Sequence, residues 1–380
     1  MKIAQVTYSL GSGGAEKLAT ELSISLKKMG HQIDYIVIDK YTQREYEQAM
    51  IDRLRKAGIQ VYSLKRRPGS GYAVVGPVAR LLKRIIQQRY NIIHSHLPLS
   101  HTFIGLARLV SPVRFRHILT VHSTMEEWSK LTSILARDAT VVFCSKAAAD
   151  TFHYKGKKNI ILNGINLSAY LSPKGNIAQL RATLGIPPDA TMLISVGGIL
   201  KGKNYSTALE VVSILQNSKP EADFHYAICG TGPEESAVRQ KTKRLSLKDR
   251  VHLLGSRSDI PNLLNTADCF MSTSLYEGLP LSVLEAFSSG TKCALSPIKE
   301  HRDISEGIPG CVLATDETPQ AMARAVLDVL EQPQLRKELK ELRNPYLKQF
   351  SFETCAKSYE DLYKKSWNWQ GCAAVLDGKE

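Results

Sequence analysis

The sequence predicts an α/β protein made of two consecutive doubly wound domains. Short apolar runs alternate with helical stretches through the first half of the 380-residue chain, and the same alternation begins again near residue 191. Strands that alternate with helices form a parallel sheet with helices on both faces. A chain of this length holds two or three domains at about 150 residues each. We therefore expect two Rossmann-like sheets, one after the other.

The apolar runs give the expected strands. In the first half they are Lys2–Tyr8, Gln32–Asp39, Gln60–Leu64, Asn91–Ser95, Ile118–His122, Ala139–Cys144 and Asn159–Leu162, with helices at Gly14–Met29, Val74–Gln88, His101–Leu109 and Lys146–His153. In the second half they are Thr191–Val196, Asp223–Cys229, Val251–Leu254, Cys269–Thr273, Thr291–Leu295 and Cys311–Leu313, with helices at Tyr205–Gln216, Glu234–Leu245, Ile260–Thr266 and Leu281–Ser289.

Segments rich in Pro and Gly between these elements predict the domain boundaries. The stretch Ser168–Asp189 is rich in Pro and Gly and is expected to contain the linker. We expect one domain over residues 1–170, a second over 171–350, a final helix over 351–367 and a loose tail over 368–380. Because parallel sheets bind ligands at the carboxyl ends of their strands, two such domains predict two ligand sites that face one cleft.

The composition excludes several classes of protein. No run of about 18 apolar residues is present, so we expect no transmembrane helix. The N-terminus has an apolar run of only strand length, which is too short for a signal peptide. The seven cysteines form no Cys-x-x-Cys pair, and we expect reduced thiols in a cytoplasmic protein.

Positive charge is concentrated in the first half. Residues 1–170 carry 25 Lys or Arg and 11 Asp or Glu, whereas residues 171–380 carry 25 of each. Between Asp52 and Glu126 there are 13 basic residues and no acidic one. This pattern is explained either by a solvated basic face or by attraction to a membrane surface, a phosphate-bearing acceptor or a nucleic acid. The candidate patch comprises Lys65, Arg66, Arg67, Lys83 and Arg84.

The most informative motif is Glu277-Gly-Leu-Pro-Leu-Ser-Val-Leu-Glu285. It follows an expected strand and opens an expected helix, so the N–H groups of the first turn, near Leu281 and Ser282, form a site suited to a diphosphate. Glu285 lies one turn inside, where its carboxylate can accept hydrogen bonds from two ribose hydroxyls. Glu277 lies within reach of a sugar beyond the diphosphate. Alternatively, the segment is a helix with an acidic first turn and a solvated Glu285.

Other motifs occur in order along the chain. They are Gly11-Ser-Gly-Gly14-Ala-Glu16, Ile92-Ile-His94-Ser-His96, Thr120-Val-His122, Leu162-Asn-Gly-Ile-Asn166, Lys201-Gly-Lys203-Asn204, Cys229-Gly-Thr-Gly232-Pro-Glu and Leu254-Gly-Ser-Arg-Ser-Asp259-Ile-Pro. The Gly11–Glu16 loop lacks the spacing of a dinucleotide-binding fingerprint. We expect His94 and His96 to point to opposite faces of their strand as packed or hydrogen-bonded side chains.

Together with the Glu277–Glu285 segment, these motifs resemble those of the retaining GT-B glycosyltransferases of family four, the glycosyl transferases group 1. The resemblance covers about residues 1–367. It implies a GT-B architecture with two Rossmann-like domains, of which the first binds the acceptor and the second binds a nucleoside diphosphate sugar. It also implies that the last helix returns to the first domain. UDP is the first expectation for the nucleotide.

The resemblance also implies roles for individual residues. Catalytic roles fall to His122, which would lie against the donor sugar, to Lys203, which would hold the diphosphate, and to Glu277, which would contact sugar hydroxyls. Glu285 would hold the ribose, and Gly14 would let the first loop approach the site closely. Gly197, Lys201, Leu281 and Ser282 complete the expected donor-binding set.

One position departs from the family pattern. The family usually has Val-Gly-Arg after the first strand of the second domain, whereas this chain has Val196-Gly197-Gly198. Lys201 could supply the missing charge, although an ammonium is not a bidentate guanidinium. No Asp-x-Asp motif is present, and we expect neither a catalytic metal nor a cofactor.

The resemblance therefore implies transfer of a hexose-type sugar, with retention of configuration, to a glycan or a lipid diphosphate-linked acceptor. Bacterial surface polysaccharide or lipopolysaccharide assembly is the expected setting. We expect a cytoplasmic protein that is peripheral on the inner face of the cytoplasmic membrane and binds no nucleic acid. Two alternatives remain open: a non-hydrolysing sugar-nucleotide epimerase, and a non-catalytic anion- or nucleic-acid-binding protein.

Overall fold

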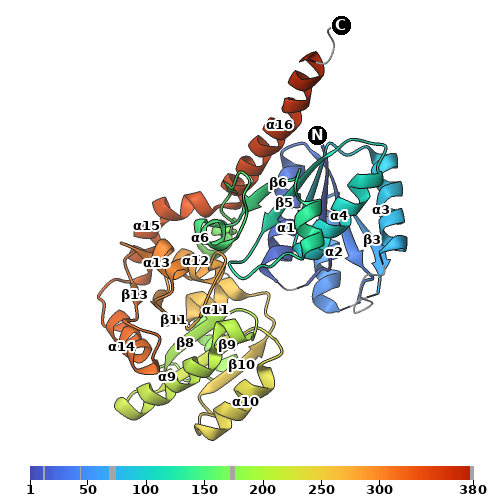
Figure 1. Cartoon of the computed structure of the whole chain (residues 1–380). Helices are drawn as coiled ribbons and strands as arrows, with labels where there is room; N and C mark the ends of the chain where they lie inside the picture. The colour runs from blue at the N-terminus through green and yellow to red at the C-terminus, as the bar shows by residue number, and fades with distance from the viewer. Residues whose placement is uncertain (12, 43, 68–73, 172–175, 377–380) are drawn as a thin grey trace. The chain divides into compact units, whose positions relative to one another are not determined.

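The computed structural model describes residues 1–11, 13–42, 44–67, 74–171 and 176–376. The chain divides into two compact units. Unit 1 comprises Met1–Gly164 and Phe352–Glu380, and unit 2 comprises Ile165–Ser351. The described helices and strands are labelled in Figure 1.

Unit 1 is built on a seven-stranded parallel sheet. The strands lie in the order β3-β2-β1-β4-β5-β6-β7. Their bounds are β1 Lys2–Thr7, β2 Gln32–Asp39, β3 Gln60–Arg66, β4 Ile92–His96, β5 Arg116–Val121, β6 Thr140–Phe143 and β7 Asn159–Ile160. The adjacent strands β1 and β4 mark the switch point of this doubly wound fold, because β2 and β3 lie on one side of them in the sheet and β5, β6 and β7 lie on the other.

Helices cover this sheet. They are α1 Gly14–Lys28, α2 Glu45–Lys56, α3 Val75–Gln88, α4 Pro98–Val110, α5 Lys130–Leu135 and α6 Lys146–Thr151. One core cluster joins α1 to the sheet through Leu18, Leu22 and Leu26, and a second joins α3 and α4 to it through Leu81, Ile85 and Phe103. The expected helices included neither α2, which has 12 residues, nor α5, which has six.

Unit 2 repeats the same design. Its six-stranded parallel sheet has the order β10-β9-β8-β11-β12-β13. The strands are β8 Thr191–Val196, β9 Phe224–Cys229, β10 Val251–Gly255, β11 Cys269–Ser272, β12 Lys292–Leu295 and β13 Cys311–Leu313. Here the switch point lies between β8 and β11. The expected fold class, two doubly wound α/β domains, is therefore confirmed.

The helices of unit 2 include several that the sequence analysis did not foresee. Those expected are α9 Tyr205–Ser218, α10 Glu235–Arg244, α11 Ile260–Thr266 and α12 Leu281–Ser288. The others are α7 Leu167–Leu171, α8 Ile177–Thr183, α13 Lys299–Ser305, α14 Pro319–Leu330 and α15 Arg336–Leu347. Short 3-10 helices lie at Lys201–Lys203 and Lys348–Phe350.

The stretch expected to contain the linker folds into unit 2. In the described part of this stretch, Arg181 of α8 donates to Asp268 at 2.7 Å and to the Ala190 carbonyl at 2.8 Å, whereas residues 172–175 lie outside the described residues. The chain passes from unit 1 to unit 2 at Gly164–Ile165 and returns at Ser351–Phe352.

The last helix, α16 Phe352–Leu376, belongs to unit 1. Its Tyr359 and Tyr363 are fully buried in the core cluster that contains α1. The loose tail expected over residues 368–380 is helical as far as Leu376, through a stretch that contains Ala and Leu and no Pro, and residues 377–380 lie outside the described residues. Within the described part of the chain, no helix is long and apolar enough to cross a membrane.

Candidate active site

A pocket opens at the switch point of unit 2. It lies at the carboxyl ends of β8 and β11, and its lining includes Ser195, Lys203, Tyr205, Ser272, Ser274 and Ser282. This is the position at which doubly wound sheets bind their ligands. The lining is largely polar and includes the ammonium of Lys203, so the pocket suits an anionic, hydroxyl-rich ligand.

Glycines allow two loops to meet beside this pocket. The Gly197 N–H donates to the Cys229 carbonyl at 2.9 Å, and the Ile199 N–H donates to the Thr231 carbonyl at 3.0 Å. A Cβ on Gly230 would lie 1.9 Å from the Gly197 carbonyl oxygen, so no other residue fits there without a backbone shift. The loop after β8 is therefore held by backbone contacts that only glycine permits.

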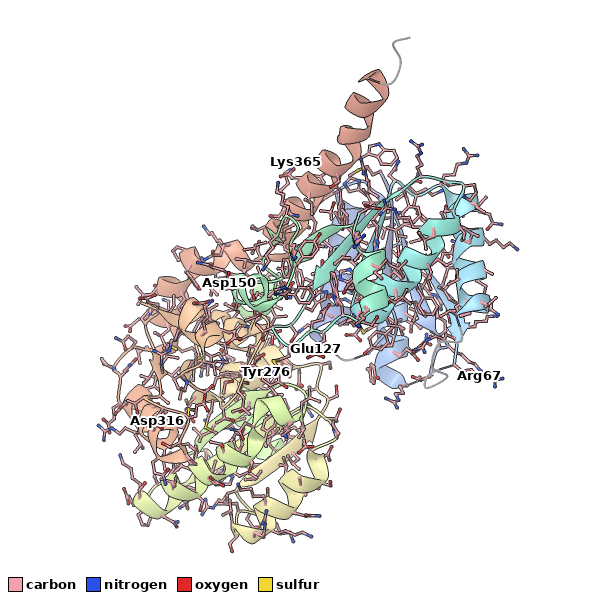
Figure 2. The ribbon with its side chains drawn as sticks, in the orientation of Figure 1. Arg67, Glu127, Asp150, Tyr276, Asp316 and Lys365 are labelled. Atoms are coloured by element: carbon pink, nitrogen blue, oxygen red, sulfur yellow. The ribbon has the colours of Figure 1, made fainter. Side chains whose placement is uncertain are left out.

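Lys203 lies in the loop after β8, at the end of the 3-10 helix Lys201–Lys203. Its carbonyl accepts a hydrogen bond from Thr273 Oγ1 at 3.1 Å, and the Gly202 carbonyl accepts one from the Leu275 N–H at 2.8 Å. A Cβ on Gly202 would lie 2.6 Å from the Tyr276 ring, whose side chain is labelled in Figure 2. These contacts fasten the loop after β8 to the loop after β11.

Lys203 and Glu277 form the central ion pair of the site. Lys203 Nζ lies 2.5 Å from Glu277 Oε1, and Ser274 Oγ donates to the same oxygen at 2.8 Å. Burial by itself would raise the pKa of Glu277, but the Lys203 ammonium and the two hydrogen bonds hold that pKa below its usual value. Glu277 is therefore an ionised carboxylate with its side chain already oriented.

A buried histidine extends this arrangement. His301 Nε2 lies 3.4 Å from Ser272 Oγ, which lies 3.2 Å from Ser274 Oγ. Burial lowers the pKa of His301 to about 4 despite the nearby Glu277 charge, so its ring is neutral at neutral pH. His301 and Ser274 were not among the predicted site residues. Ser274 lies three residues before Glu277, outside the Glu277–Glu285 motif, and His301 had no signal beyond its position after β12.

Glu285 lies inside the first turns of α12 and is 5% exposed. The Tyr170 hydroxyl, from α7, forms a hydrogen bond with its carboxylate, and burial together with the Glu285 charge raises the pKa of Tyr170. No motif in the sequence indicated Tyr170 as a partner of Glu285. At the helix start, the Leu281 N–H donates to the Leu279 carbonyl at 2.8 Å, so this amide already has a partner. Ser282 lines the pocket.

Lys201 and Gly198 stand at the edge of this arrangement. Lys201 is exposed and projects from the same 3-10 helix as Lys203. A Cβ on Gly198 would meet only Leu200 at 3.4 Å and the Thr231 carbonyl at 3.7 Å, which are ordinary contacts. The backbone at Gly198 therefore has room for a Cβ.

In unit 1, His122 follows β5 directly. Its Nε2 lies 3.0 Å from His96 Nδ1, and its backbone N–H donates to Glu126 Oε2 at 3.0 Å. Gly14 begins α1, and the preceding loop is close-packed: a Cβ on Gly13 would lie 2.6 Å from a Glu16 carboxylate oxygen. The glycines of this loop thus make room for the buried Glu16.

The expectation for His94 and His96 was wrong in one respect. Their ring centroids lie 4.1 Å apart, so the two rings share one face of β4. The reason is that side chains alternate along a strand, which places residues i and i+2 on the same side. Both rings are fully buried and hydrogen-bonded, as expected. Across the described residues, no group of three or more His, Cys, Asp or Glu side chains has an arrangement that could hold a metal ion.

The basic patch also requires correction. Arg66 is buried and donates to both carboxylate oxygens of Asp39, at 2.6 and 3.0 Å. Arg84 donates to Asp34 at 3.0 Å and lies over the Tyr62 ring. Arg66 and Arg84 thus form ion pairs within unit 1, with aspartates that are distant in the sequence. The exposed members are Lys65, Arg67 (labelled in Figure 2) and Lys83.

Comparison with known proteins agrees with this geometry. The model of the family "Glycosyl transferases group 1" matches residues 176–343, and that of "Glycosyltransferase Family 4" matches residues 12–169. The chain belongs to the group 1 glycosyltransferases. Its architecture is GT-B: the structure of Anabaena HepE in complex with UDP and glucose superposes with a TM-score of 0.81 at 18% identity, over 96% of this chain and all of that one.

Two curated relatives show what this glycosyltransferase is similar to. N-acetyl-alpha-D-glucosaminyl L-malate synthase of Bacillus anthracis is 24% identical over 92% of this chain and 93% of its own length. The UDP-Gal:alpha-D-GlcNAc-diphosphoundecaprenol alpha-1,3-galactosyltransferase of Escherichia coli is 25% identical over 74% of this chain and 77% of its own length.

Proposed function

We propose that this glycosyltransferase moves a hexose-type sugar from a nucleoside diphosphate sugar, UDP first, to a hydroxyl of a glycan or lipid diphosphate-linked acceptor, with retention of configuration. The observation that carries the proposal is the oriented Lys203–Glu277 pair beside the pocket of unit 2. The UDP bound to HepE and the lipid-linked substrate named for the E. coli relative support the choice of donor and acceptor class.

The chemistry follows from the charges in the pocket. As the bond between the anomeric carbon and the diphosphate breaks, negative charge develops on the leaving oxygen. Lys203 Nζ is already held in place by Glu277, so it can stabilise that charge without a large reorganisation. The departing phosphate takes the proton of the acceptor hydroxyl as the new glycosidic bond forms on the same face. Glu277 accepts hydrogen bonds from sugar hydroxyls, and Glu285 accepts them from the ribose.

A binding screen tests the donor. Sugar nucleotides are added in turn and the melting temperature is measured, because a ligand at 100 times its Kd adds about 2.7 kcal/mol of stability. We expect a UDP-sugar to stabilise the protein most. Turnover of that donor is then followed with polyprenyl-diphosphate and glycan acceptors, and the anomeric coupling in the product reports retention. Donor conversion without any acceptor would indicate an epimerase instead.

The two glutamates give a sharper test within the same site. Glu285→Ala should weaken binding of free UDP, since the ribose loses its partner. Glu277→Ala should leave UDP binding nearly unchanged and depress turnover, since its partners are sugar hydroxyls. Equal loss of UDP affinity in both variants would contradict these roles.

We also propose that unit 1 docks on an anionic membrane, which would place the enzyme on the cytoplasmic face during polysaccharide or lipopolysaccharide assembly. The exposed face of α3 supports this proposal. Val75 is 82% exposed and Ile86 is 42% exposed on that helix, and the exposed Lys83 lies between them in sequence. Apolar side chains flanked by cations are typical of helices that lie in a lipid interface.

Vesicle binding tests the docking surface. Replacing the exposed patch members Lys65, Arg67 and Lys83 by Gln should weaken binding to anionic vesicles, because each cation near such a surface contributes about 1 kcal/mol. The matched control replaces three exposed cations of unit 2, Lys243, Arg244 and Lys248, by Gln. Equal weakening in both variants, or binding that ignores salt, would refute the surface. Tighter salt-sensitive binding to nucleic acid than to lipid would favour the nucleic-acid alternative.

A further inference from the structure

A continuous chain of hydrogen-bonded side chains connects the last helix with His122 inside unit 1. It involves β1, β4, β5 and α16, whose residues are far apart in sequence. In order, the links are His122 Nε2 to His96 Nδ1 (3.0 Å), His96 Nε2 to Gln5 Oε1 (2.8 Å), Gln5 Nε2 to Tyr363 Oη (3.3 Å), Tyr363 Oη to His94 Nδ1 (2.7 Å) and His94 Nε2 to Thr120 Oγ1 (2.7 Å).

The chemistry of the links gives this chain a direction. The Gln5 carbonyl oxygen can only accept, so His96 Nε2 must carry a hydrogen and donate it. The Gln5 amide donates to the Tyr363 oxygen, and the Tyr363 hydroxyl hydrogen then has His94 Nδ1 as its acceptor. His94 in turn donates from Nε2 to Thr120. This is the arrangement in which every hydrogen of the chain has an acceptor.

All three histidines in the chain are neutral. His94 and His96 are fully buried, and burial holds their pKa values well below the ordinary range. Burial lowers the pKa of His122 to about 4, although the Glu126 charge opposes this shift. A neutral ring carries one hydrogen only, so each ring that donates from one nitrogen accepts at the other.

The direction of the chain therefore fixes the ring of His122. Since His96 donates from Nε2, its Nδ1 must accept, and His122 must donate from Nε2. His122 Nδ1 is then left as a lone pair. This atom is buried and has no hydrogen-bond partner among the described residues. A buried acceptor without a partner is costly, which points to a ligand hydroxyl as its missing donor.

We propose that Tyr363 is a positioning residue that sets the tautomer of His122, so that Nδ1 offers a lone pair to a substrate hydroxyl. The ligand part of this proposal rests on the proposed glycosyl transfer, whereas the tautomer is a property of the free protein. Tyr363 belongs to α16 of unit 1. It acts through Gln5 and His96.

Removal of the Tyr363 hydroxyl should remove the constraint that sets the direction of these hydrogen bonds. Without it, the Gln5 amide has no acceptor for its N–H group and can turn over to present that group to His96 Nε2. His96 would then accept at Nε2 and donate from Nδ1, which requires His122 Nε2 to accept. The His122 hydrogen would move to Nδ1, and that nitrogen could no longer accept from a hydroxyl.

Tyr359 provides the matched control. It is also a fully buried tyrosine of α16, but its hydroxyl lies 2.9 Å from Thr120 Oγ1, at the far end of the chain beyond His94. Its loss leaves the Gln5–Tyr363 link in place. Tyr359→Phe and Tyr363→Phe therefore remove the same atom from the same helix, and only the second should alter His122.

The experiment is ¹⁵N NMR of the imidazole rings in histidine-labelled full-length protein, with His122→Gln used to assign the signals. We expect the Nε2–H tautomer of His122 in the wild type and in Tyr359→Phe, and a shift toward Nδ1–H in Tyr363→Phe. Loss of one correctly oriented hydrogen bond should lower kcat by about tenfold in Tyr363→Phe, with the Kd for UDP unchanged.

Three results would overturn the proposal: an Nδ1–H tautomer in the wild type, an unchanged tautomer in Tyr363→Phe, or equal changes in both tyrosine variants. An altered tautomer with unchanged kcat would retain the positioning role of Tyr363 but refute the role of Nδ1 toward substrate. Failure of the proposed function itself would appear as absent sugar-nucleotide turnover in the wild type, with the tautomer result unaffected.

Discussion

Removal of Lys203 should cost both activity and stability. Lys203→Ala would leave the Glu277 carboxylate, 10% exposed, without its cationic partner at 2.5 Å. Breaking a buried ion pair by removing one partner costs about 3–5 kcal/mol. We expect the lower end, about 3 kcal/mol, because Ser274 still donates to Glu277 and 24% of the Lys203 side chain is exposed. For a unit of this size, this corresponds to a fall in Tm of about 6–12 °C.

The pH dependence of this effect has a definite sign. In the wild type the pKa of Glu277 is held below its unfolded value, so the pair contributes stability above that unfolded value and loses it as the pH falls through the folded pKa. In Lys203→Ala, burial would instead raise the pKa of Glu277. The stability difference between wild type and variant should therefore be largest at neutral pH and should shrink toward pH 4.

Calorimetric melting and turnover assays separate the two consequences. The double variant Lys203→Ala/Glu277→Gln should regain most of the lost stability, because neither charge remains, but none of the activity. Turnover should fall by about 10²–10³ in Lys203→Ala, as for other preorganised groups that stabilise a leaving charge. Lys201→Ala, an exposed control in the same 3-10 helix, should leave the Tm unchanged. A Tm unchanged in Lys203→Ala, or a double variant as unstable as the single one, would refute the reasoning.

Other substitutions probe the rest of the two units. Gly198→Arg should tighten UDP binding, measured by calorimetry, because the site has room for a Cβ and the guanidinium would add a bidentate donor; weaker binding together with a lower Tm would show that the space is insufficient. If Lys201 supplies the charge missing at Gly198, Lys201→Ala should lower turnover nearly as much as Lys203→Ala does. Full activity in Lys201→Ala would refute this role. Tyr170→Phe should weaken UDP binding several-fold by loosening Glu285, and an unchanged Kd would refute this link. Arg66→Gln should destabilise unit 1 by about 3 kcal/mol in urea unfolding, because buried Asp39 would lose both hydrogen bonds from Arg66; an unchanged free energy of unfolding would show that this ion pair contributes no net stability.

The sequence by itself determined the local features of this protein. The alternation of apolar runs and helical stretches predicted the two parallel sheets, because strand and helix periods are properties of neighbouring residues. The segment Glu277–Glu285 predicted a loop that leads into α12 at the carboxyl end of β11, for the same reason. Helices α2 and α5 were not among the named helices; α5 spans only six residues, fewer than two turns, so it has no helical period to detect.

Only the tertiary structure decided which distant residues meet. Lys203 and Glu277 are 74 positions apart, and nothing local indicates that one neutralises the other. In the same way, Asp39 removes Arg66 from the basic surface across 27 positions. The direction of the hydrogen bonds at His122 depends on Tyr363 of the last helix, which reaches it through Gln5 and His96. Charge, burial and proton position depend on neighbours in space, and chain order alone does not specify those neighbours.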